Sequence, residues 1–481
     1  MHQLGTLKAN HQPLTIPLEQ RFQSVYAIGQ TGTGKSTFLK HGFLQDVYSG
    51  FGACYFDFHG QDARWLLDRI PRNRLDDVIY VNPLDPTAVI GFNPFDGVRE
   101  GQDEQATAAI VASLKHIFAD SWGGRMDDIL TNAVRPLFHL PYERKTTLLA
   151  AIRMLNDPTY RVWVLKHCRE RAVTDFWERE FANWTKSDQN ANVNSTLNKI
   201  RRFEAVPLLR RTFGQVRSRI NLRHAVEAGK LIIFDFNKPQ MGEVNASVMG
   251  ALFLSRLIHE AMTRPQPTID GEVFTGALKP FFFHIDEFHS VMSSATTIAF
   301  SEGRKFRMGI SAVHQFTRQL TATTPGRQVF DAVVGNVGTK IVFRIGGNDA
   351  DELFRALEVA EPKHLTELPD YNFIAYLKQG RAMKRMRATT VLPDAPRHGY
   401  GASIIRRMKA DVGTPITEID TAYETLADRR FVGIVKAGKR TEPKQPATRP
   451  RQQRKPGKGQ PHQFRPLGAV MLDRFCADPE S

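Results

Sequence analysis

A short stretch near the amino end combines glycines, a lysine and a hydroxyl at a spacing that suits phosphate binding. Residues 29–36, GQTGTGKS, fit the pattern G-x-x-x-x-G-K-[ST]. Glycines let the backbone fold around a phosphate with its N–H groups pointing inward. Lys35 adds a positive charge for the β- and γ-phosphates, and the Ser36 hydroxyl is a ligand for Mg²⁺. The stretch therefore predicts binding of ATP together with Mg²⁺. The predicted nucleotide contacts are Gly29, Gln30, Thr31, Gly32, Thr33, Gly34, Lys35, Ser36 and Thr37.

A pair of acids ends the apolar run Phe281–Ile285. We expect Asp286 to hold Mg²⁺ through its water shell, alongside Ser36, and Glu287 to polarise the attacking water. Strands often end in Asp, so the pair alone is weak support for catalysis. The phosphate-binding pattern upstream favours the catalytic interpretation. Adjacent Asp and Glu indicate an ATPase with a built-in catalytic glutamate, a class made up mostly of motors and remodelling machines.

A sheet must place these two sites together, and the sequence carries suitable strands. Apolar runs of four to eight residues alternate with segments of helical periodicity, which predicts a mostly parallel α/β sheet. The predicted strands are Ser24–Ile28, Gly52–Phe58, Val78–Val81, Leu231–Phe236, Phe281–Ile285, Gly309–Val313, Lys340–Ile345 and Phe373–Leu377. A helix is expected from Thr37 to about Val47, directly after the glycine-rich turn.

The rest of the chain divides around this sheet. Residues 1–24 predict a short hairpin, and residues 25–100 with 225–402 form the ATPase core. Residues 101–224 lack strand-like runs and predict an all-helical insertion, and residues 403–435 a helical extension. In the tail, 436–481, the segment Lys436–Arg465 holds ten Lys or Arg and one acid, a net charge of +9. Its frequent Pro and Gln predict disorder.

Composition sets limits on the class of protein. Hydrophobic residues make up 41% of the 481 residues and charged residues 24%, as in a globular protein. The net charge of +15 suits a polyanion such as nucleic acid, although the tail supplies more than half of it. Three widely spaced cysteines predict reduced thiols in a cytoplasmic protein, and no apolar run is long enough to span a bilayer. We therefore expect no integral membrane segment.

Five further motifs make the chain resemble the HerA/FtsK superfamily of P-loop ATPases. Within it, the closest likeness is to the conjugative coupling proteins of type IV secretion, the TraG/TraD type. The motifs are YFDFHG at 55–60, GFNPF at 91–95, SWGGR at 121–125, LIIFDF at 231–236 with Gly242-Glu243, and GRKF at 303–306 leading to Val313-His-Gln315. The resemblance runs from about Ser24 to Ala402.

The resemblance implies a RecA-like core that assembles into a homo-hexamer, with nucleotide between subunits and DNA in the channel. It places Gln315 as a polar sensor of the γ-phosphate and Arg304 as a finger that reaches the neighbouring subunit's nucleotide. Arg344 is the rival finger, and for all three residues an ordinary structural role stays open.

Two features depart from the resemblance. Coupling proteins usually begin with membrane helices, which are not expected here, and translocases of the HerA type usually carry an amino-terminal β-barrel. Only 24 residues precede the first expected core strand, too few for such a barrel. Membrane coupling and fixed docking to a partner are therefore open.

Other basic and histidine residues allow two interpretations. Lys199–Arg223 holds eight Lys or Arg and one acid, Glu204, which suits either phosphate contacts or a solvated helical face. The candidate phosphate contacts are Arg201, Arg202, Arg210, Arg211, Arg217 and Arg219. We expect His59, His284, His289 and His314 to be hydrogen-bonded structural residues, because their spacing does not suit zinc.

The leading hypothesis is an ATP-driven DNA translocase for conjugative or mobile-element transfer, or for DNA processing with a partner. A relaxase, a nuclease or a secretion channel would be that partner. The alternatives are a secretion or assembly ATPase acting on protein cargo, and a nucleotide-gated scaffold of a defence complex. DNA-stimulated ATP hydrolysis separates the first from the second.

Overall fold

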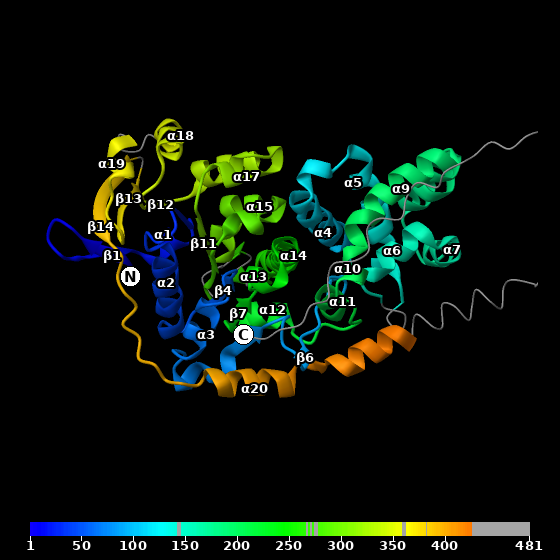
Figure 1. Cartoon of the computed structure of the whole chain (residues 1–481), viewed down its shortest axis with the longest axis horizontal. Helices are drawn as coiled ribbons and strands as arrows, with labels where there is room; N and C mark the ends of the chain where they lie inside the picture. The colour runs from blue at the N-terminus through cyan, green and yellow to red at the C-terminus, as the bar shows by residue number, and fades with distance from the viewer. Residues whose placement is uncertain are drawn as a thin grey trace, which may run out of the picture. The chain divides into compact units, whose positions relative to one another are not determined.

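The computed structural model describes residues 1–425 except 142–145, 266–267, 270–271, 274–277, 358–361 and 381. The tail expected at 436–481 and the last ten residues of the expected extension lie outside the described residues. The centre of the fold is an eleven-stranded sheet in the order β2-β1-β14-β13-β12-β3-β11-β10-β4-β7-β5 (Figure 1). Its strands are β1 (His2–Leu7), β2 (Pro13–Ile16), β3 (Val25–Ile28), β4 (Gly52–Asp57), β5 (Val78–Val81), β7 (Leu231–Asp235), β10 (Phe281–Ile285), β11 (Met308–His314), β12 (Thr339–Val342), β13 (Asn372–Gln379) and β14 (Ala382–Thr389).

Seven neighbouring strands, from β12 to β5, run parallel. Six of them, β3, β4, β7, β10, β11 and β12, are buried at every position, as expected for a sheet covered on both faces. The predicted α/β fold with a mostly parallel sheet is therefore confirmed. β3 leads into the phosphate loop, and β10 leads into the acidic pair. β11 lies between these two strands in the sheet.

Four antiparallel strands extend this sheet beyond β12. β13 pairs with β12 and β14, and β1 joins the edge of β14 through the pairs Thr6 with Thr389 and Leu7 with Ala388. The amino-terminal hairpin thus belongs to the central sheet, a pairing that the sequence does not indicate. β14 is absent from the strands predicted from the sequence, because its alternation is hidden by Lys384, Arg385 and Arg387.

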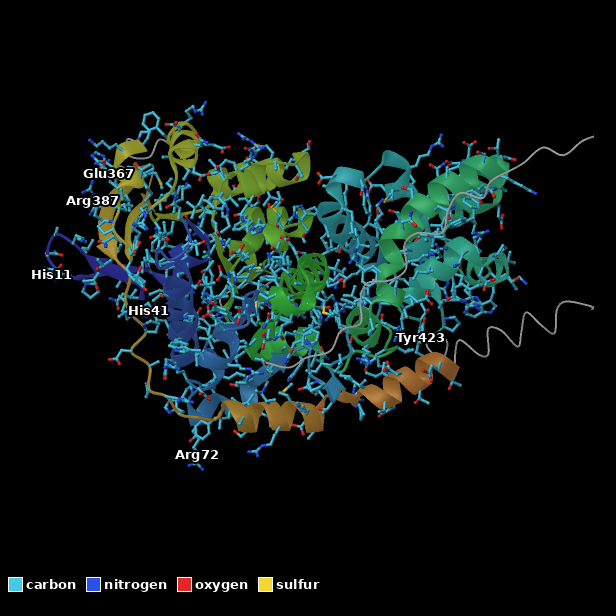
Figure 2. All side chains as sticks on the ribbon, viewed as in Figure 1. His11, His41, Arg72, Glu367, Arg387 and Tyr423 are labelled. Carbon is cyan, nitrogen blue, oxygen red and sulfur yellow. The ribbon has the colours of Figure 1, made fainter. Side chains whose placement is uncertain are left out.

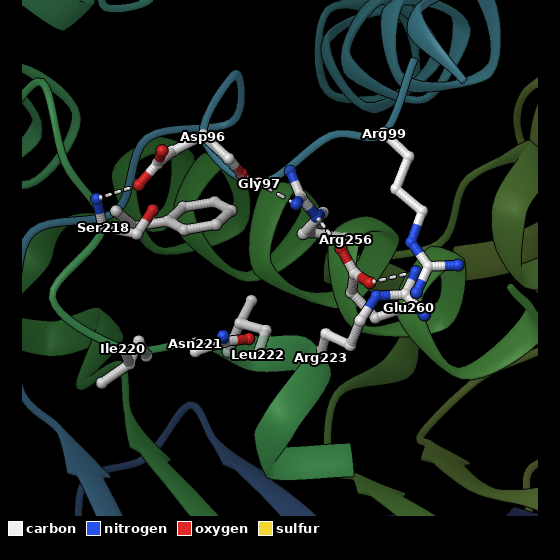
Figure 3. A pocket seen from close by; sticks show the side chains of 11 residues that line it. Asp96, Gly97, Arg99, Ser218, Ile220, Asn221, Leu222, Arg223, Arg256 and Glu260 are labelled. Atoms are coloured by element: carbon white, nitrogen blue, oxygen red, sulfur yellow. Dashed lines mark hydrogen bonds and ion pairs between the residues drawn. The ribbon is translucent and has the colours of Figure 1, made fainter. Parts of the chain in front are cut away.

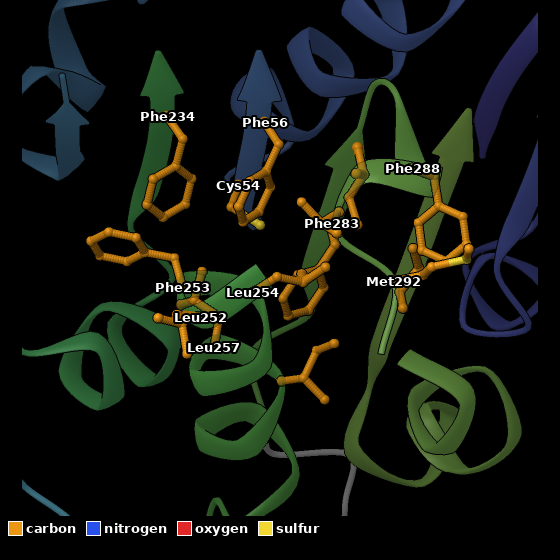
Figure 4. Packing of buried hydrophobic residues seen from close by; sticks show 14 of the residues in the cluster. Cys54, Phe56, Phe234, Leu252, Phe253, Leu254, Leu257, Phe283, Phe288 and Met292 are labelled. Atoms are coloured by element: carbon orange, nitrogen blue, oxygen red, sulfur yellow. The ribbon is translucent and has the colours of Figure 1, made fainter. Parts of the chain in front are cut away.

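Helices cover both faces of the sheet. Tyr55 of β4 packs edge-on against Phe43 of α2 (Lys35–Tyr48), with ring centroids 5.6 Å apart. Successive strand residues face opposite sides, and Phe56 stacks on Phe234, which meets Phe253 of α14 (Glu243–Met262) at 5.1 Å (Figure 4). Burial of each such aromatic side chain stabilises the fold by about 1.5–3 kcal/mol. This core holds the strand ends in fixed positions.

The described part of residues 101–224 is helical and contains no strand. Its helices are α4 (Asp103–Ile117), α5 (Gly124–Val134), α6 (Leu149–Asn156), α7 (Pro158–Leu165), α8 (Arg171–Asp175), α9 (Lys186–Ile200), α10 (Arg202–Ala205) and α11 (Pro207–Phe213), with a π-helix at Phe176–Phe181. α4 packs on α14, where the Ser113 hydroxyl lies 2.8 Å from that of Ser255. Ser255 in turn lies 3.2 Å from the Ser293 hydroxyl, so a buried polar chain joins this helical region to the core.

The GFNPF motif links the same two regions. Phe92 stacks on Phe253 with centroids 4.2 Å apart, and the Asn93 amide donates to the carbonyls of Thr146 and Val216. Both motif side chains are buried. The structure therefore gives this motif a packing role.

The segment after the sheet runs from the core to the helical region. Arg407 of α20 (Gly401–Asp411) donates to the Leu75 carbonyl at 2.7 Å. Residues 416–425 form a further helix, on which Tyr423 donates to Glu204 at 2.8 Å (Figure 2). In the described part of the chain we find no helix with the length and apolar character needed to cross a bilayer.

The other elements are short or cover the sheet. The remaining helices are α1 (Leu18–Arg21), α3 (Asp62–Leu67), α12 (Leu222–Ala228), α13 (Lys238–Met241), α15 (Ser294–Glu302), α16 (Arg318–Thr321), α17 (Thr324–Asn336), α18 (Gly347–Leu357) and α19 (Pro362–Thr366). The 3₁₀ segments include Phe288–Ser290 and Gly303–Phe306. Two strand pairs lie outside the main sheet: β6 (Ala88–Val89) with β15 (Thr414–Pro415), and β8 (Thr268–Ile269) with β9 (Glu272–Val273).

Candidate active site

The loop 29–34 connects β3 to α2 and has the backbone that a phosphate cradle needs. Gly32 and Gly34 have φ values of +80° and +106°, a region that side chains disfavour. Lys35, which is buried, donates from Nζ to the Gln30 carbonyl at 2.7 Å, and burial lowers its pKa. Thr37 lies in the first turn of α2, so its backbone shares the positive amino end of that helix. The predicted phosphate-binding residues thus form one continuous turn.

Ser36 and Asp286 meet at the end of β10. The Ser36 hydroxyl donates to Asp286 Oδ2 at 2.9 Å, although the two residues lie 250 positions apart. Burial and the negative charge of Glu287 raise the pKa of Asp286. A hydroxyl and a carboxylate side by side are the oxygen ligands that Mg²⁺ prefers. These two side chains fit the predicted metal site, and a cation there would offset the repulsion between the two acids.

Glu287 is fixed by its backbone and by three side chains. Its φ of +50° is left-handed, which is uncommon for a residue with a side chain. Gln315 Nε2 donates to Glu287 Oε1 at 2.5 Å, and the Gln315 Oε1 atom accepts from the Thr31 hydroxyl at 2.9 Å. Gln315 follows β11, the strand between β3 and β10. It therefore connects the phosphate loop to the acidic pair.

Two histidines complete the surroundings of Glu287. His59 Nε2 lies 3.4 Å from Oε1, and His289 Nδ1 lies 3.3 Å from Oε2. Burial would raise the pKa of Glu287, but its contacts with His59, His289 and Gln315 outweigh burial and lower it to about 2. The contact with Glu287 raises the pKa of His59, whereas burial lowers that of His289 to about 4. Glu287 is therefore an anion near neutral pH.

The turn that presents His59 is built by one carboxylate. Asp57 accepts backbone N–H groups from His59, Gly60 and Ala63 at 2.8–2.9 Å. The sequence predicts structural roles for His59 and His289, and the structure places both against the candidate catalytic acid instead. The position of His59 in the sequence could have indicated this contact. His59 follows β4 as Glu287 follows β10, and β4 and β10 are parallel neighbours.

The other two histidines lie inside the core. His284 is within 2.8 Å of Asp46, which also forms a buried ion pair with Arg21. His314 shares a hydrogen bond of 2.7 Å with the Tyr26 hydroxyl. These contacts agree with the expected hydrogen-bonded structural roles.

The two candidate finger arginines differ in their surroundings. Arg304 lies in the 3₁₀ turn Gly303–Phe306, is exposed, and has no hydrogen-bond or ion-pair partner for its side chain among the described residues. Arg344 forms an ion pair with Asp370 at 2.7 Å and donates to the Leu368 carbonyl. Lys35, Ser36, Asp286, Glu287 and Gln315 come together in one subunit, and Arg304 does not join them.

Most of the candidate phosphate contacts in the helical region have structural partners. Arg211 pairs with Asp420 at 2.6 Å, and Arg202 donates to Asn245 at 3.2 Å. Arg223, which ends the same basic run but is not one of the candidate contacts, pairs with the buried Glu260 at 2.8 Å. Arg201 and Arg219 are exposed, and neither side chain forms a hydrogen bond or ion pair with another described residue.

A cavity of about 320 Å³ lies between α12, α14 and the loop after β6, and neither the phosphate loop nor the acidic pair lines it (Figure 3). Glu260 sits in its wall, paired with Arg223 and with Arg256 at 2.6 Å. Arg256 also donates to the carbonyls of Pro94 and Asp96. These ion pairs and hydrogen bonds fasten the loop to α14, and none of the candidate catalytic residues lines the cavity.

Asp103, His139 and Glu170 form a second cluster that contains metal-ligand side chains. His139 Nε2 lies 3.4 Å from a carboxylate oxygen of each acid, and Arg135 pairs with Glu170 at 2.7 Å. The Arg169 N–H donates to His139 Nδ1, which leaves the Nε2 proton facing the two acids. All three side chains therefore already have polar partners, and Arg135 supplies the positive charge beside Glu170.

Several solved structures share this fold. The conjugative coupling protein TrwBdeltaN70 matches with a TM-score of 0.62 and 15% identity, over 83% of this chain and 90% of that one. The chain shares its fold with a conjugative coupling protein. TrwB in complex with ADP and Mg²⁺ matches with a TM-score of 0.60 and 14% identity over 83% and 92% of the two chains. VirB4 of Thermoanaerobacter pseudethanolicus matches with a TM-score of 0.55 and 13% identity over 82% and 96%.

These likenesses confirm the predicted resemblance to coupling proteins at the level of the fold. No family model matches the sequence, and no curated protein sequence matches it. At identities of 13–15% the neighbours show the fold alone.

Proposed function

We propose that the protein is an ATP-driven motor that acts on DNA. The observation that carries the proposal is the Thr31–Gln315–Glu287 connection, which joins a phosphate loop to an acidic pair within a coupling-protein fold. TrwB itself is known in complex with an ATP analogue and with ADP and Mg²⁺, which supports ATP and Mg²⁺ as the ligands here.

Each side chain has a distinct task in the proposed hydrolysis. Lys35 exchanges the Gln30 carbonyl for oxygens of the β- and γ-phosphates. Ser36 and Asp286 would hold Mg²⁺, which would supply positive charge to the phosphates. Glu287 orients the attacking water. With a pKa of about 2 it accepts a proton poorly, so orientation and polarisation of the water are its main contributions while its three contacts last.

Gln315 is placed to respond to the γ-phosphate. It touches the exposed Thr31 on the loop and Glu287 on the acidic strand, so a γ-phosphate between them would compete for the same amide. The surroundings of the two candidate arginines support a finger at Arg304. Its side chain lacks a partner among the described residues of its own chain, whereas Arg344 is paired with Asp370. We therefore assign the finger that acts on a neighbouring subunit to Arg304, in a hexamer.

The antiparallel end of the sheet supports a polyanionic partner. Lys384, Arg385 and Arg387 of β14 are exposed, as is Lys378 of β13, and none of the four has an ion-pair partner among the described residues. Figure 2 labels Arg387. The sequence from 371 to 393 contains no acid. β1 pairs with β14 only at Ala388 and Thr389, and charges on the part of a strand without such a partner also discourage aggregation. The DNA role therefore needs a direct test.

The test measures ATP hydrolysis with single-stranded DNA, double-stranded DNA and no DNA. We expect DNA to stimulate turnover. Replacement of Lys384, Arg385 and Arg387 by Ala should weaken DNA binding and lower the salt slope by about 0.9 for each phosphate that the protein no longer neutralises. The matched control replaces Arg72, Lys166 and Lys186, three exposed cations on other elements. A turnover rate that DNA does not change would favour a protein cargo instead. Equal losses of DNA affinity in both triple variants would argue against a DNA-binding role for β14.

A further inference from the structure

Tyr371 stands out beside the phosphate loop, at the point where β13 begins. It is 46% exposed, and its hydroxyl has no partner among the described residues. Its φ of +60° lies in the left-handed region, where a side chain is unfavourable. A glycine would avoid this cost, so the ring is held at the surface against a backbone preference.

Backbone contacts fix the ring against the loop. The Tyr371 N–H donates to the Thr33 carbonyl at 2.9 Å, and the Tyr371 carbonyl accepts from the Thr390 N–H at 2.8 Å. A Cβ placed on Gly34 would lie 2.9 Å from the Tyr371 ring atom Cδ1. The ring edge therefore lies against the loop immediately before Lys35.

The sheet order shows which way a bound nucleotide must point. The γ-phosphate end must lie toward Glu287 and Gln315, which follow β10 and β11 on one side of β3. The phosphate chain then leaves the loop toward the other side of β3, over β12 and β13. Tyr371 lies on that side, at the same edge of the sheet, because β13 runs antiparallel to β12.

A second observation points to a missing partner at this place. The Thr390 hydroxyl is buried and makes no hydrogen bond in the described structure. It lies 3.5 Å from the position of a Cβ on Gly34, so it faces the same part of the loop as Tyr371. Buried polar groups without partners are uncommon and call for an explanation such as a ligand.

We propose that Tyr371 is the stacking platform for the base of the bound nucleotide, with Thr390 beside it. The inference rests on the proposed ATPase function and adds the subsite for the nucleoside half of the substrate. Every base has a π-face, so an aromatic ring binds purines without reading their edges. The site therefore accepts ATP and GTP alike.

The test separates the base from the phosphates. Tyr371→Gly removes the ring and suits the left-handed backbone, and Tyr371→Phe keeps the ring as the matched control. Calorimetry measures the Kd of wild type and both variants for MgATP, MgGTP and magnesium tripolyphosphate. Thermal melting verifies that the variants are folded.

In Tyr371→Gly we expect ATP and GTP affinity to fall by about ten- to a hundredfold, the range for loss of a base–aromatic stack. Tripolyphosphate affinity should stay within about twofold of wild type, since the substitution changes none of the side chains that are proposed to hold the phosphates and Mg²⁺. Tyr371→Phe should bind all three ligands as wild type does. An unchanged ATP affinity in Tyr371→Gly would overturn the inference. Equal losses for ATP and tripolyphosphate would also overturn it, because the ring would then only support the loop. A wild-type protein that binds neither ligand would refute the proposed ATPase function itself, and the base subsite with it.

Discussion

Replacement of Glu287 by Gln separates nucleotide binding from hydrolysis. The amide keeps the shape of the carboxylate, and its oxygen can still accept from Gln315 Nε2. It cannot polarise the attacking water as an anion does. Loss of such a group lowers turnover by about 10²–10⁴-fold, which corresponds to about 2.7–5.4 kcal/mol of transition-state stabilisation. We expect the Kd for MgATP to be unchanged or tighter, because a negative charge beside the triphosphate is gone.

The assay pairs single-turnover hydrolysis with equilibrium binding of MgATP. Lys35→Ala is the matched control, because it removes the cation that reaches the phosphates and should abolish binding rather than chemistry. The two variants should therefore fail at different steps. Equal loss of ATP affinity in both, or turnover in Glu287→Gln above about a tenth of wild type, would refute the division of roles.

Three other predictions concern the ring, the core and the tail. Arg304→Ala subunits mixed into wild type should lower ATPase activity more than in proportion, and a linear mixing curve would argue against a shared site. Asp46→Asn should destabilise the fold by about 3–5 kcal/mol in urea unfolding, because it leaves the buried Arg21 charge without its partner; a loss below about 1 kcal/mol would contradict this. Arg21 and His284 outweigh burial and hold the pKa of Asp46 below its ordinary value. The stabilisation from this carboxylate is therefore present above pH ~4 and is lost as pH falls further. The free energy of unfolding should depend less on pH in Asp46→Asn, which lacks the carboxylate. Removal of Lys436–Ser481 should weaken DNA binding at low salt and leave it unchanged at high salt, and equal binding at low salt would assign the tail to a protein partner.

Local patterns make the fold class and the central chemistry predictable. A phosphate loop is a continuous run of residues, so Gly29–Ser36 can be recognised without knowledge of the fold. The buried strands are equally clear, because every residue of β4 and β10 is buried and both sequences are apolar runs. β14 carries no such signal, since its exposed Lys and Arg side chains resemble a loop. Sequence periodicity reveals strands through their buried positions, and β14 has few buried positions.

The surroundings of the catalytic acid depend on strand order, which the sequence does not state. His59 reaches Glu287 because β4 is the parallel neighbour of β10, and Gln315 reaches it because β11 lies on the other side. In the sequence alone, His59 and His284 both resemble buried core histidines. His284 is a core residue that contacts Asp46, whereas His59 lies just beyond the end of its strand and contacts Glu287. Only the position relative to the strand end distinguishes the two.

Tyr371 cannot be assigned from the sequence for a related reason. In a parallel sheet the functional edge collects the residues that follow each strand, as Gln315 follows β11 and Glu287 follows β10. β13 runs the opposite way, so the residue that precedes it arrives at that edge instead. A search for site residues at the carboxyl ends of strands would miss Tyr371, although its backbone N–H donates a hydrogen bond to Thr33 of the phosphate loop. The reversal of one strand thus brings an aromatic ring to the nucleotide side of a loop more than 330 residues upstream.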